Sequence, residues 1–263
     1  MIKVAVCGCF GKMGSTCIEA INAASDMELV CGITKASDVN NASCAQASFP
    51  VFYDLHTALE SVDFDVYVDF TQPDVVENNL RTVLPNGIDC VVGTTGLSTE
   101  TLQELNTIAK NGTCLFYAPN FTTGAVLMMQ FAKAAAPYFP EAEVIEFHHC
   151  NKKDAPSGTA VNTAKLISNA RGNVASSAPG KETENDGMEG ARGALVEGVP
   201  VHSVRSMGFV ATQEVIFGSY GQTLTIKHDS WDRQSYMPGV LLGIRSVGEH
   251  EGLIIGLENF MNL

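Results

Sequence analysis

The amino-acid sequence predicts an α/β protein in which a doubly wound parallel sheet is followed by a second, α+β domain. Three observations support this fold class. Short apolar runs alternate with helix-like segments through residues 1–120. A glycine-rich loop directly follows the first apolar run. The alternation stops after Pro119-Asn120, and the later strands look antiparallel, which indicates a different architecture for the second half.

The expected strands of the first domain are short and almost continuously apolar, as is typical of parallel strands covered on both faces. They are Ile2–Gly8, Glu28–Thr34, Val66–Phe70, Ile88–Gly93 and Cys114–Ala118. The helices expected between them are Met13–Ala24, Leu55–Glu60, Val75–Leu84 and Thr99–Lys110. This βαβ order favours a parallel sheet with helices on both faces.

The second half begins with an expected helix, Gly124–Tyr138, a strand, Ala142–His148, and a further helix, Ser157–Arg171. Residues 175–198 are rich in Gly, Ser, Glu and Asp, so we expect a solvated loop without regular structure there. The remaining expected elements are strands at Val201–Arg205, Gln213–Phe217 and Thr223–His228, the last two joined as a hairpin, and a helix at Ser235–Val247. The apolar pattern of this last helix does not decide which domain contains it.

The composition limits the classes of function. A formal net charge of −13 disfavours binding to nucleic acid or to an anionic membrane surface. The chain has no apolar run of transmembrane length and no signal-peptide pattern at its N-terminus, so we expect a cytoplasmic protein. The eight cysteines show no CxxC pair and no zinc-binding spacing, which indicates reduced, mostly buried thiols and no metal site.

Residues 8–14 form a glycine loop, Gly-Cys-Phe-Gly-Lys-Met-Gly, between the first strand and the first helix. Such a loop permits a tight turn and a close approach of the backbone to a pyrophosphate, while the helix N-terminus attracts the anion. The placement predicts a Rossmann-like site for a nicotinamide dinucleotide, NADPH or NADH. A glycine turn without a ligand would show the same pattern.

The end of the second strand normally discriminates NAD from NADP, because an acidic residue there binds the ribose 2′-hydroxyl. This chain has Thr34-Lys35 and no acid at that point, and Lys35 and Lys12 can face a 2′-phosphate. The residues therefore favour NADPH or tolerance of both cofactors. Loops at Phe70–Pro73 and Gly93–Gly96 also follow strand ends, where sheets of this class bind ligands.

The densest polar stretch is "EFHHCNKKDAPSGTA", residues 146–160. Ser157 is predicted to be a helix N-cap, which leaves the N–H groups of Gly158 and Thr159 at an exposed helix start that suits a carboxylate. We expect Asp154 to order this loop through a backbone or lysine contact. The stretch therefore predicts an anion site beside two imidazoles and two ammonium groups.

The two histidines of this stretch can exchange protons near neutral pH, and a nearby lysine would lower the pKa of either one. Neighbours in a regular strand point to opposite faces, so His148 and His149 can share a site only where the strand is irregular. A metal site formed by His148, His149 and Cys150 is a minor alternative.

The segment "HHCNKKDAPSGTA" resembles the signature of the dihydrodipicolinate reductase family. The segments "AVCGCFGKMG", "VDFTQPD", "VVGTTG" and "APNFTTGAVLMMQFAK" are similar to the cofactor and domain-junction segments of that family. The residues from Val201 onward, "VHSVRSMGFVATQEVIFGSYGQTLTIKHDSWDRQSYMPGVLLGIR", also resemble its C-terminal half. The resemblance covers essentially the whole chain in the expected order.

The resemblance implies hydride transfer from NADH or NADPH to a cyclic imine dicarboxylate, giving tetrahydrodipicolinate in the diaminopimelate and lysine pathway. By motif position it implies that His148 is a proton donor and acceptor and that Lys152 is a second donor. It implies substrate contacts from His149, Gly158 and Thr159. The cofactor contacts that it implies are Gly8, Cys9, Phe10, Gly11, Lys12, Met13, Gly93, Thr94, Thr95, Pro119, Asn120, Phe121 and Thr122, beside Thr34 and Lys35.

The family fold returns the C-terminal helix to the nucleotide domain. The resemblance therefore implies a dinucleotide-binding domain of residues 1–121 and 229–263, and a substrate-binding and oligomerisation domain of residues 122–228 with an open mixed sheet. It also implies a homotetramer built through that sheet. Thr34 departs from the acidic residue that many members carry, which makes the preference for NADH less secure.

Two other functions fit parts of the pattern. One is a different two-domain NAD(P)-dependent dehydrogenase that uses Cys150 as a nucleophile. The other is a nucleotide-sensing regulator without enzymatic activity, which would bind the dinucleotide but reduce nothing.

Overall fold

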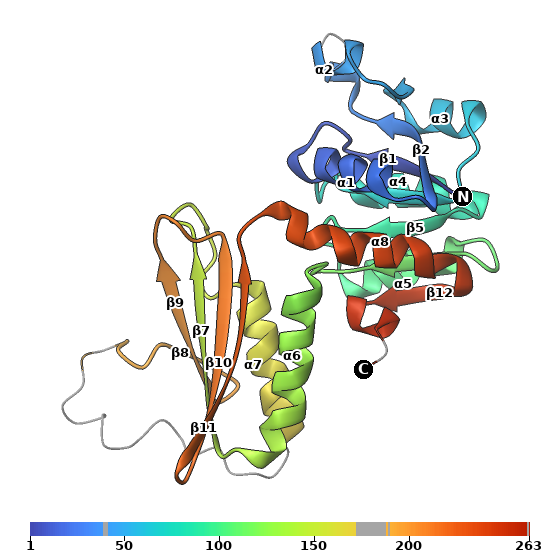
Figure 1. Cartoon of the computed structure of the whole chain (residues 1–263). Coiled ribbons are helices and arrows are strands. Elements are labelled where there is room, and N and C mark those ends of the chain that lie inside the picture. Colours follow the sequence, from blue (N-terminus) through green and yellow to red (C-terminus); the bar gives the residue numbers. More distant parts are fainter. Residues whose placement is uncertain (39–41, 172–187, 189, 262) are drawn as a thin grey trace. The chain divides into compact units, whose positions relative to one another are not determined.

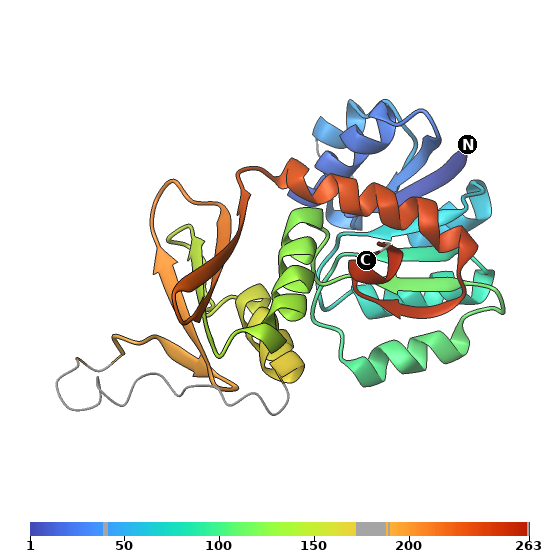
Figure 2. The same cartoon turned by 60° about the horizontal axis from the view of Figure 1, so that its bottom comes forward.

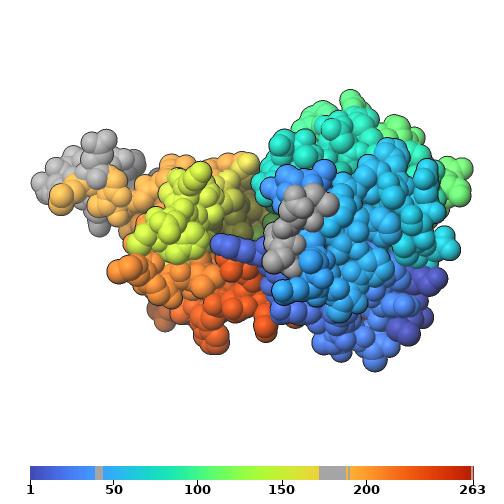
Figure 3. Space-filling model, turned by 90° about the horizontal axis from the view of Figure 1, so that it is seen from above, coloured from blue at the N-terminus to red at the C-terminus, as the bar shows by residue number. Residues whose placement is uncertain are grey.

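The computed structural model of the chain describes residues 1–38, 42–171, 188, 190–261 and 263. It divides into two compact units. Unit 1 comprises Met1–Thr123 and Tyr236–Leu263, and unit 2 comprises Gly124–Ser235 (Figure 1). In the space-filling view, the blue-to-green segments of unit 1 pack together as one body (Figure 3).

Within the described residues, unit 1 contains a seven-stranded sheet in the order β12-β6-β5-β4-β1-β2-β3, and its paired strands are parallel. The strands are β1 (Ile2–Cys7), β2 (Met27–Ile33), β3 (Val51–Phe52), β4 (Val66–Asp69), β5 (Asp89–Val92), β6 (Cys114–Tyr117) and β12 (Gly252–Ile255). The helices are α1 (Lys12–Ala23), α2 (Ala42–Ala45), α3 (Leu55–Ser61), α4 (Val76–Val83), α5 (Thr99–Ile108) and α8 (Met237–Ser246). The predicted parallel, doubly wound sheet is confirmed.

The five strands expected in this unit are all present, and each ends one residue earlier than predicted. Strands β3 and β12 were not predicted. Strand β3 has only two residues, too few to show a period, and β12 is an edge strand whose residues are mostly half-buried. Both lie at the ends of the strand order, where weak apolar patterning is expected because one side of the strand has no neighbour.

Strand β1 lies at the point where the strand order reverses, with β2 on one side and β4 on the other. Sheets of this kind bind ligands beyond the carboxyl ends of the strands at such a point. Buried β1 and β4 residues anchor this part of the sheet, and Val4, Val6 and Val68 are 0% exposed. The loops that follow β1, β4 and β5 are thereby held at one edge.

The C-terminal segment belongs to unit 1. Strand β12 pairs with β6, and Arg245 of α8 forms an ion pair with Asp26, with Nε and Oδ2 2.6 Å apart. Gly239 brings α8 against the backbone, since a Cβ there would lie 2.0 Å from the carbonyl oxygen of Phe121. Pro238 lies in the first turn of α8, where its missing N–H is tolerated.

Unit 2 contains a five-stranded mixed sheet in the order β11-β10-β7-β9-β8, as far as its residues are described. The strands are β7 (Glu141–His148), β8 (Ala194–Val196), β9 (Val199–Arg205), β10 (Ala211–Ser219) and β11 (Gln222–Ser230). Strands β7 and β9 are parallel, whereas the other pairs are antiparallel. Helices α6 (Thr123–Ala135) and α7 (Gly158–Arg171) lie side by side on one face of this sheet (Figure 1, Figure 2).

The hairpin expected between the last two strands is confirmed as β10–β11. The loop expected over residues 175–198 lies largely outside the described residues, and its described end corrects the expectation. Residues Ala194–Val196 form β8, which pairs with β9 across Glu197-Gly198. Both turn residues have positive φ, 47° and 83°, as a two-residue hairpin requires. A three-residue strand is too short to be found from periodicity.

Among the described residues, no helix combines the length and the apolar character that crossing a bilayer requires.

Candidate active site

The glycine loop of unit 1 is shaped by close backbone contacts. Gly8 has a φ of +79°, and a Cβ there would lie 2.5 Å from the carbonyl oxygen of Phe70. A Cβ on Gly14 would lie 2.1 Å from the carbonyl oxygen of Gly8. Gly11 is the N-cap of α1, and no described side chain caps that helix. The bare loop and the uncapped helix start fit a pyrophosphate, which the first N–H groups of α1 would bind.

A pocket of about 350 Å³ opens beside this loop at the carboxyl edge of the sheet. Its lining residues are Met13, Phe70, Thr71, Gln72, Pro73, Gly93, Thr94 and Thr95. Gly93 is required there, since a Cβ would lie 2.2 Å from the ring of Phe70. The structure thus brings together the predicted residues Met13, Gly93, Thr94 and Thr95, in a pocket of the size that small-molecule sites usually have.

Asp69, at the end of β4, connects two loops that border this pocket. It is fully buried, and its Oδ1 accepts hydrogen bonds from the amide and hydroxyl of Thr71 (3.0 and 2.6 Å) and from the hydroxyl of Thr94 (2.8 Å). Its Oδ2 accepts from Tyr67 Oη (2.8 Å) and Asn79 Nδ2 (3.0 Å). Sequence reasoning assigned no role to Asp69, although a charge ending an apolar strand indicates a buried group that needs partners.

Not every predicted cofactor residue offers its side chain to a ligand. Cys9 and Phe121 are 1% and 3% exposed, and burial raises the pKa of the Cys9 thiol to about 12. The Phe121 ring packs at 6.2 Å from that of Phe70 and 5.7 Å from that of Phe116. Thr122 is also buried, and its amide donates to Asn120 Oδ1 at 2.8 Å. Cys9 and Phe121 can therefore meet a ligand only through the backbone.

The end of β2 carries an acid that the sequence pattern did not reveal. The hydroxyl of Thr34 donates to Asp38 Oδ2 at 2.6 Å, and Lys35 Nζ lies 4.0 Å from Asp38 Oδ1. Asp38 ends a short 3-10 helix, Ala36–Asp38, that folds back onto the strand end. A carboxylate is thus present where cofactor discrimination normally occurs, four residues later than expected. The absence of an acid at position 34 is therefore weaker evidence for a preference for NADPH than the sequence alone suggests.

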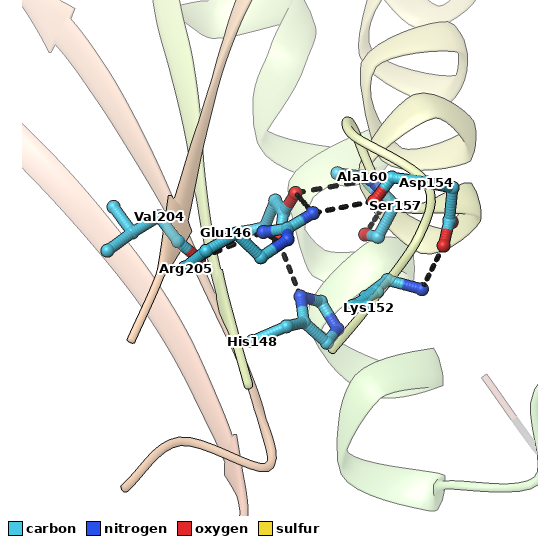
Figure 4. Close-up of polar contacts among 8 residues, drawn as sticks. All are labelled: Glu146, His148, Lys152, Asp154, Ser157, Ala160, Val204 and Arg205. Atoms are coloured by element: carbon cyan, nitrogen blue, oxygen red, sulfur yellow. Dashed lines mark hydrogen bonds and ion pairs between the residues drawn. The ribbon is translucent and has the colours of Figure 1, made fainter. Parts of the chain in front are cut away.

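In unit 2, the end of β7 places Glu146 and His148 on one face of the sheet, because strand side chains repeat every two residues (Figure 4). Glu146 is fully buried, and its carboxylate accepts two hydrogen bonds from Arg205, through Nη1 and Nη2, both at 2.8 Å. It is also bonded to His148 Nδ1 and accepts from the amide of Ser157 at 3.2 Å. One carboxylate therefore joins β7, β9 and the polar stretch.

Arg205 reaches the same loop from β9. It lies opposite His148 in the register of β7 and β9, and its Nη2 donates to the carbonyl of Asp154 at 2.8 Å. Neither Glu146 nor Arg205 was predicted. The signal for Glu146 was its position in β7, where it alternates with the buried residues Ala142 and Val144 and so occupies an inward site.

The charges of this cluster shift the pKa values of its members. Burial opposes ionisation of Glu146, but hydrogen bonds from Arg205, Ser203 and His148 hold its pKa below the ordinary value. Burial lowers the pKa of His148, Glu146 opposes that shift, and the cations of Lys152 and Arg205 add to it. Because Nδ1 faces the carboxylate and must carry a hydrogen, Nε2 is the nitrogen left to exchange a proton.

The loop beyond β7 confirms two predictions. Ser157 caps α7, since its hydroxyl accepts from the amide of Ala160 at 3.2 Å. Asp154 orders the loop through Lys152, whose Nζ lies 2.8 Å from Oδ1 (Figure 4). The Lys152 contact lowers the pKa of Asp154, and a hydrogen bond from the Gly158 amide contributes to the same shift. The helix start predicted to bind a carboxylate therefore already contacts one from its own loop.

The remaining residues of the stretch lie outward. The strand ends at His148, so His149 sits in the following turn, where its carbonyl accepts from the Lys152 amide at 3.1 Å. His149, Cys150 and Lys153 are exposed. Around Gly158, no described atom would come within 4 Å of an added Cβ, so the space beside that residue is open. No group of three or more His, Cys, Asp and Glu residues able to hold a metal occurs in the described part of the chain.

Sequence models of two domains match this chain. The model described as dihydrodipicolinate reductase, N-terminus, matches residues 2–121, and the one described as dihydrodipicolinate reductase, C-terminus, matches residues 124–261. The chain is 45% identical to the 4-hydroxy-tetrahydrodipicolinate reductase of Mycolicibacterium smegmatis and 46% identical to that of Mycolicibacterium gilvum. Each alignment covers 100% of both chains.

Solved structures show the same relationship. A dipicolinate-bound dihydrodipicolinate reductase from Paenisporosarcina sp. TG-14 superposes with a TM-score of 0.90 at 41% identity, covering 99% of this chain and 100% of the other. An amine dehydrogenase from Mycobacterium smegmatis has a TM-score of 0.67 at 13% identity and covers 98% of this chain and 95% of the other, which shows a shared fold alone.

Replacing Asp69 by asparagine is expected to weaken dinucleotide binding by about tenfold or more, because an amide NH₂ would face donors that are now satisfied, at a cost of about 1–3 kcal/mol. Fluorescence titration with NADH measures this. Asp89→Asn is the matched control, since Asp89 accepts from the Cys114 amide at the opposite end of the sheet. Wild-type affinity in Asp69→Asn would show that the loops do not depend on this carboxylate.

Proposed function

This chain belongs to the dihydrodipicolinate reductase family, and we propose that His148 and Lys152 carry out its proton transfers. It is an oxidoreductase, a 4-hydroxy-tetrahydrodipicolinate reductase of the diaminopimelate and lysine pathway, and it uses NADH or NADPH. The observation that carries the assignment of roles is the cluster at the end of β7, where an imidazole and an ammonium group lie beside the start of α7 and the space next to Gly158 is open.

We propose that the glycine loop and the pocket of unit 1 hold the dinucleotide. The backbone of Gly8–Met13 would bind the pyrophosphate, and Gly93–Thr95 would border the nicotinamide, with Pro119–Thr122 closing the same edge. Thr34 and Lys35, together with Asp38, would contact the adenosine ribose. When bound, the reduced nicotinamide supplies a hydride. The residues of this unit orient the cofactor.

The proton chemistry follows from the groups near β7. Reduction of a cyclic imine dicarboxylate leaves a ring that must gain a proton, so a proton donor is needed beside it. Lys152 is an ammonium donor held by Asp154, and His148 can donate from Nε2 only as an imidazolium, because Nδ1 is bonded to Glu146. His148 would then exchange its proton with solvent. The two residues thus act as complementary donors.

The substrate is a dianion and needs cationic or N–H partners in a chain with a net charge of −13. We propose that His149, Gly158 and Thr159 bind its carboxylates at the start of α7. The open space beside Gly158 supports this, as does the dipicolinate, itself a dicarboxylate, bound to the relative from Paenisporosarcina. The substrate would take over contacts that Asp154 now makes with Lys152 and Gly158.

We also propose a homotetramer that works in the cytoplasm, where its eight free thiols would stay reduced. The support for assembly is the face of the unit 2 sheet opposite α6 and α7. It presents Ile145, Phe147, Val204 and Ile216, which are half-buried or exposed; Phe147 lies opposite Val204 in register, whereas Ile145 lies opposite His202 and Glu214. Apolar side chains exposed on one face and rimmed by polar residues are typical of a protein–protein contact.

His148→Gln and Lys152→Ala are each expected to lower turnover by roughly 10²- to 10⁴-fold, the range of general acid–base catalysis, with unchanged NADH affinity. Steady-state kinetics with the condensation product of pyruvate and aspartate semialdehyde measures this. Lys153→Ala, an exposed neighbour, serves as the control and should retain turnover. Full activity in both variants would refute the assignment.

In the wild type, the limb of the pH–rate profile that is due to His148 should lie at a lower pH than an ordinary histidine gives, since the pKa of His148 is lowered.

Gly158→Ala is expected to raise the KM for the dicarboxylate by about tenfold, the order of one lost hydrogen bond to a charged group, because the methyl group occupies the open approach to the helix start. The KM for NADH should be unchanged. The thermal unfolding temperature should not fall, since alanine favours the helix and meets no described neighbour. An unchanged substrate KM would place the carboxylate elsewhere.

Light scattering is expected to give a mass about four times that of the 28.0 kDa chain. Ile216→Lys should reduce this mass, because it buries a charge in the proposed contact face. Tyr138→Lys should leave the mass unchanged, because Tyr138 is 80% exposed in the 3-10 helix Ala136–Tyr138 that follows α6. A monomeric wild type at micromolar concentration would contradict the proposal.

A further inference from the structure

We propose that Glu146 is a positioning residue for His148, and that Arg205 serves as the counter-ion that keeps Glu146 ionised inside the unit. This inference rests on the proposed role of His148 and adds to it. The contact between the Glu146 carboxylate and His148 Nδ1 carries it, because the carboxylate is fully buried and lies two residues before the histidine on the same strand face (Figure 4).

The contact fixes which nitrogen of His148 is active. A carboxylate accepts hydrogen bonds, so the hydrogen on the imidazole stays at Nδ1 and Nε2 becomes the exchanging atom. A carboxylate on the far nitrogen also holds the plane of a histidine ring and stabilises its cationic form. Both effects would be absent if Nδ1 faced water.

Arg205 makes this arrangement possible. Burial favours protonation of a carboxylate that lacks a cation or several hydrogen-bond donors, and a protonated Glu146 would be a weaker acceptor for the imidazole N–H and would carry no charge to stabilise the imidazolium. The guanidinium approaches Glu146 with both terminal nitrogens at 2.8 Å, which is the bidentate geometry that best stabilises a carboxylate. Because Arg205 and His148 are opposite each other in the register of β9 and β7, sheet formation sets the position of all three groups.

The charged groups that face His148 determine the expected pH response. They are Glu146 on its own strand, Arg205 on β9 and Lys152 in the loop, while β10 places the uncharged Ala211 opposite it. Removing the negative charge of Glu146 leaves two cations beside the imidazole. Both destabilise the imidazolium, so the His148 titration should move to lower pH.

Strand β7 contains a matched control. Glu143 is bonded to Arg192 and accepts from His202 Nε2 at 2.6 Å, so it has the same pair of partner types as Glu146. It lies on the opposite face of the strand, and its side chain is 28% exposed. Glu143→Gln therefore removes a comparable charge without touching the cluster around His148, and it should retain turnover.

The test compares Glu146→Gln, Glu143→Gln, His148→Gln and the double variant Glu146→Gln/His148→Gln. Glu146→Gln is expected to lower kcat by about 10- to 100-fold, as loss of a carboxylate that orients a functional histidine commonly does, with the KM for NADH unchanged. The His148 resonance in an NMR pH titration should move to lower pH. The double variant should be no slower than His148→Gln alone, because Glu146 acts through that ring.

Three outcomes would overturn the inference: wild-type kcat in Glu146→Gln, an unshifted His148 titration, or losses that add in the double variant. If His148→Gln itself stays active, the proposed role of His148 is wrong; if only Glu146→Gln stays active, the positioning role alone is wrong. Should Glu146→Gln fail to fold, Glu146→Asp keeps the charge and withdraws the carboxylate by one methylene group. It should lower kcat while restoring most of the His148 titration, and a wild-type kcat would overturn the proposal.

Discussion

The buried ion pair between Glu146 and Arg205 is the interaction on which the proposed chemistry of unit 2 depends. A carboxylate that is fully buried needs a cation or several hydrogen-bond donors, and Arg205 on the neighbouring strand supplies Glu146 with a cation and two hydrogen bonds of 2.8 Å. The same two residues then bind the Ser157 amide and the Asp154 carbonyl. The loop with Lys152 and the start of α7 are thereby attached to the sheet, and His148 is attached to the same carboxylate.

Unit 1 also contains a buried carboxylate, which neutral hydrogen-bond donors stabilise. Asp69 is as deeply buried as Glu146, but its partners are hydroxyl, amide and side-chain N–H groups rather than an arginine. This difference suits the tasks proposed for the two units. A cation beside the proposed nicotinamide pocket would change its electrostatics, whereas cations beside the proposed site of a dianionic substrate are favourable. In both units a buried carboxylate at a strand end accepts hydrogen bonds from the loops that follow and holds them in place.

Asp154 shows that an anion site can be satisfied by the protein itself before a ligand arrives. Its carboxylate contacts Lys152 at 2.8 Å and accepts from the Gly158 amide, two of the groups proposed to meet substrate. The helix start is therefore kept paired rather than left with unsatisfied donors, as buried or partly buried polar groups generally are. A substrate carboxylate that exchanges with that of Asp154 would meet partner groups that the loop already orients.

The sequence by itself determined the elements with a strong local signal. The apolar runs of β1, β2, β4, β5 and β6, the glycine loop at Gly8–Gly14 and the Ser157 cap all follow from side-chain chemistry within a few residues. The family signature located His148 and Lys152. The short strands β3, β8 and β12 could not be found in this way, because their stability comes from neighbours in the sheet and not from their own pattern.

Only the tertiary structure decided which distant residues meet at the sites. Arg205 reaches Glu146 through the register of β9 against β7, and Asp38 reaches Thr34 because a 3-10 helix folds back on the strand end. Asp69 joins two loops that are separated by more than twenty residues of sequence. These contacts depend on strand order and register, which no local pattern records. The sequence therefore specified the groups proposed to react, and the fold specified the charges that orient them.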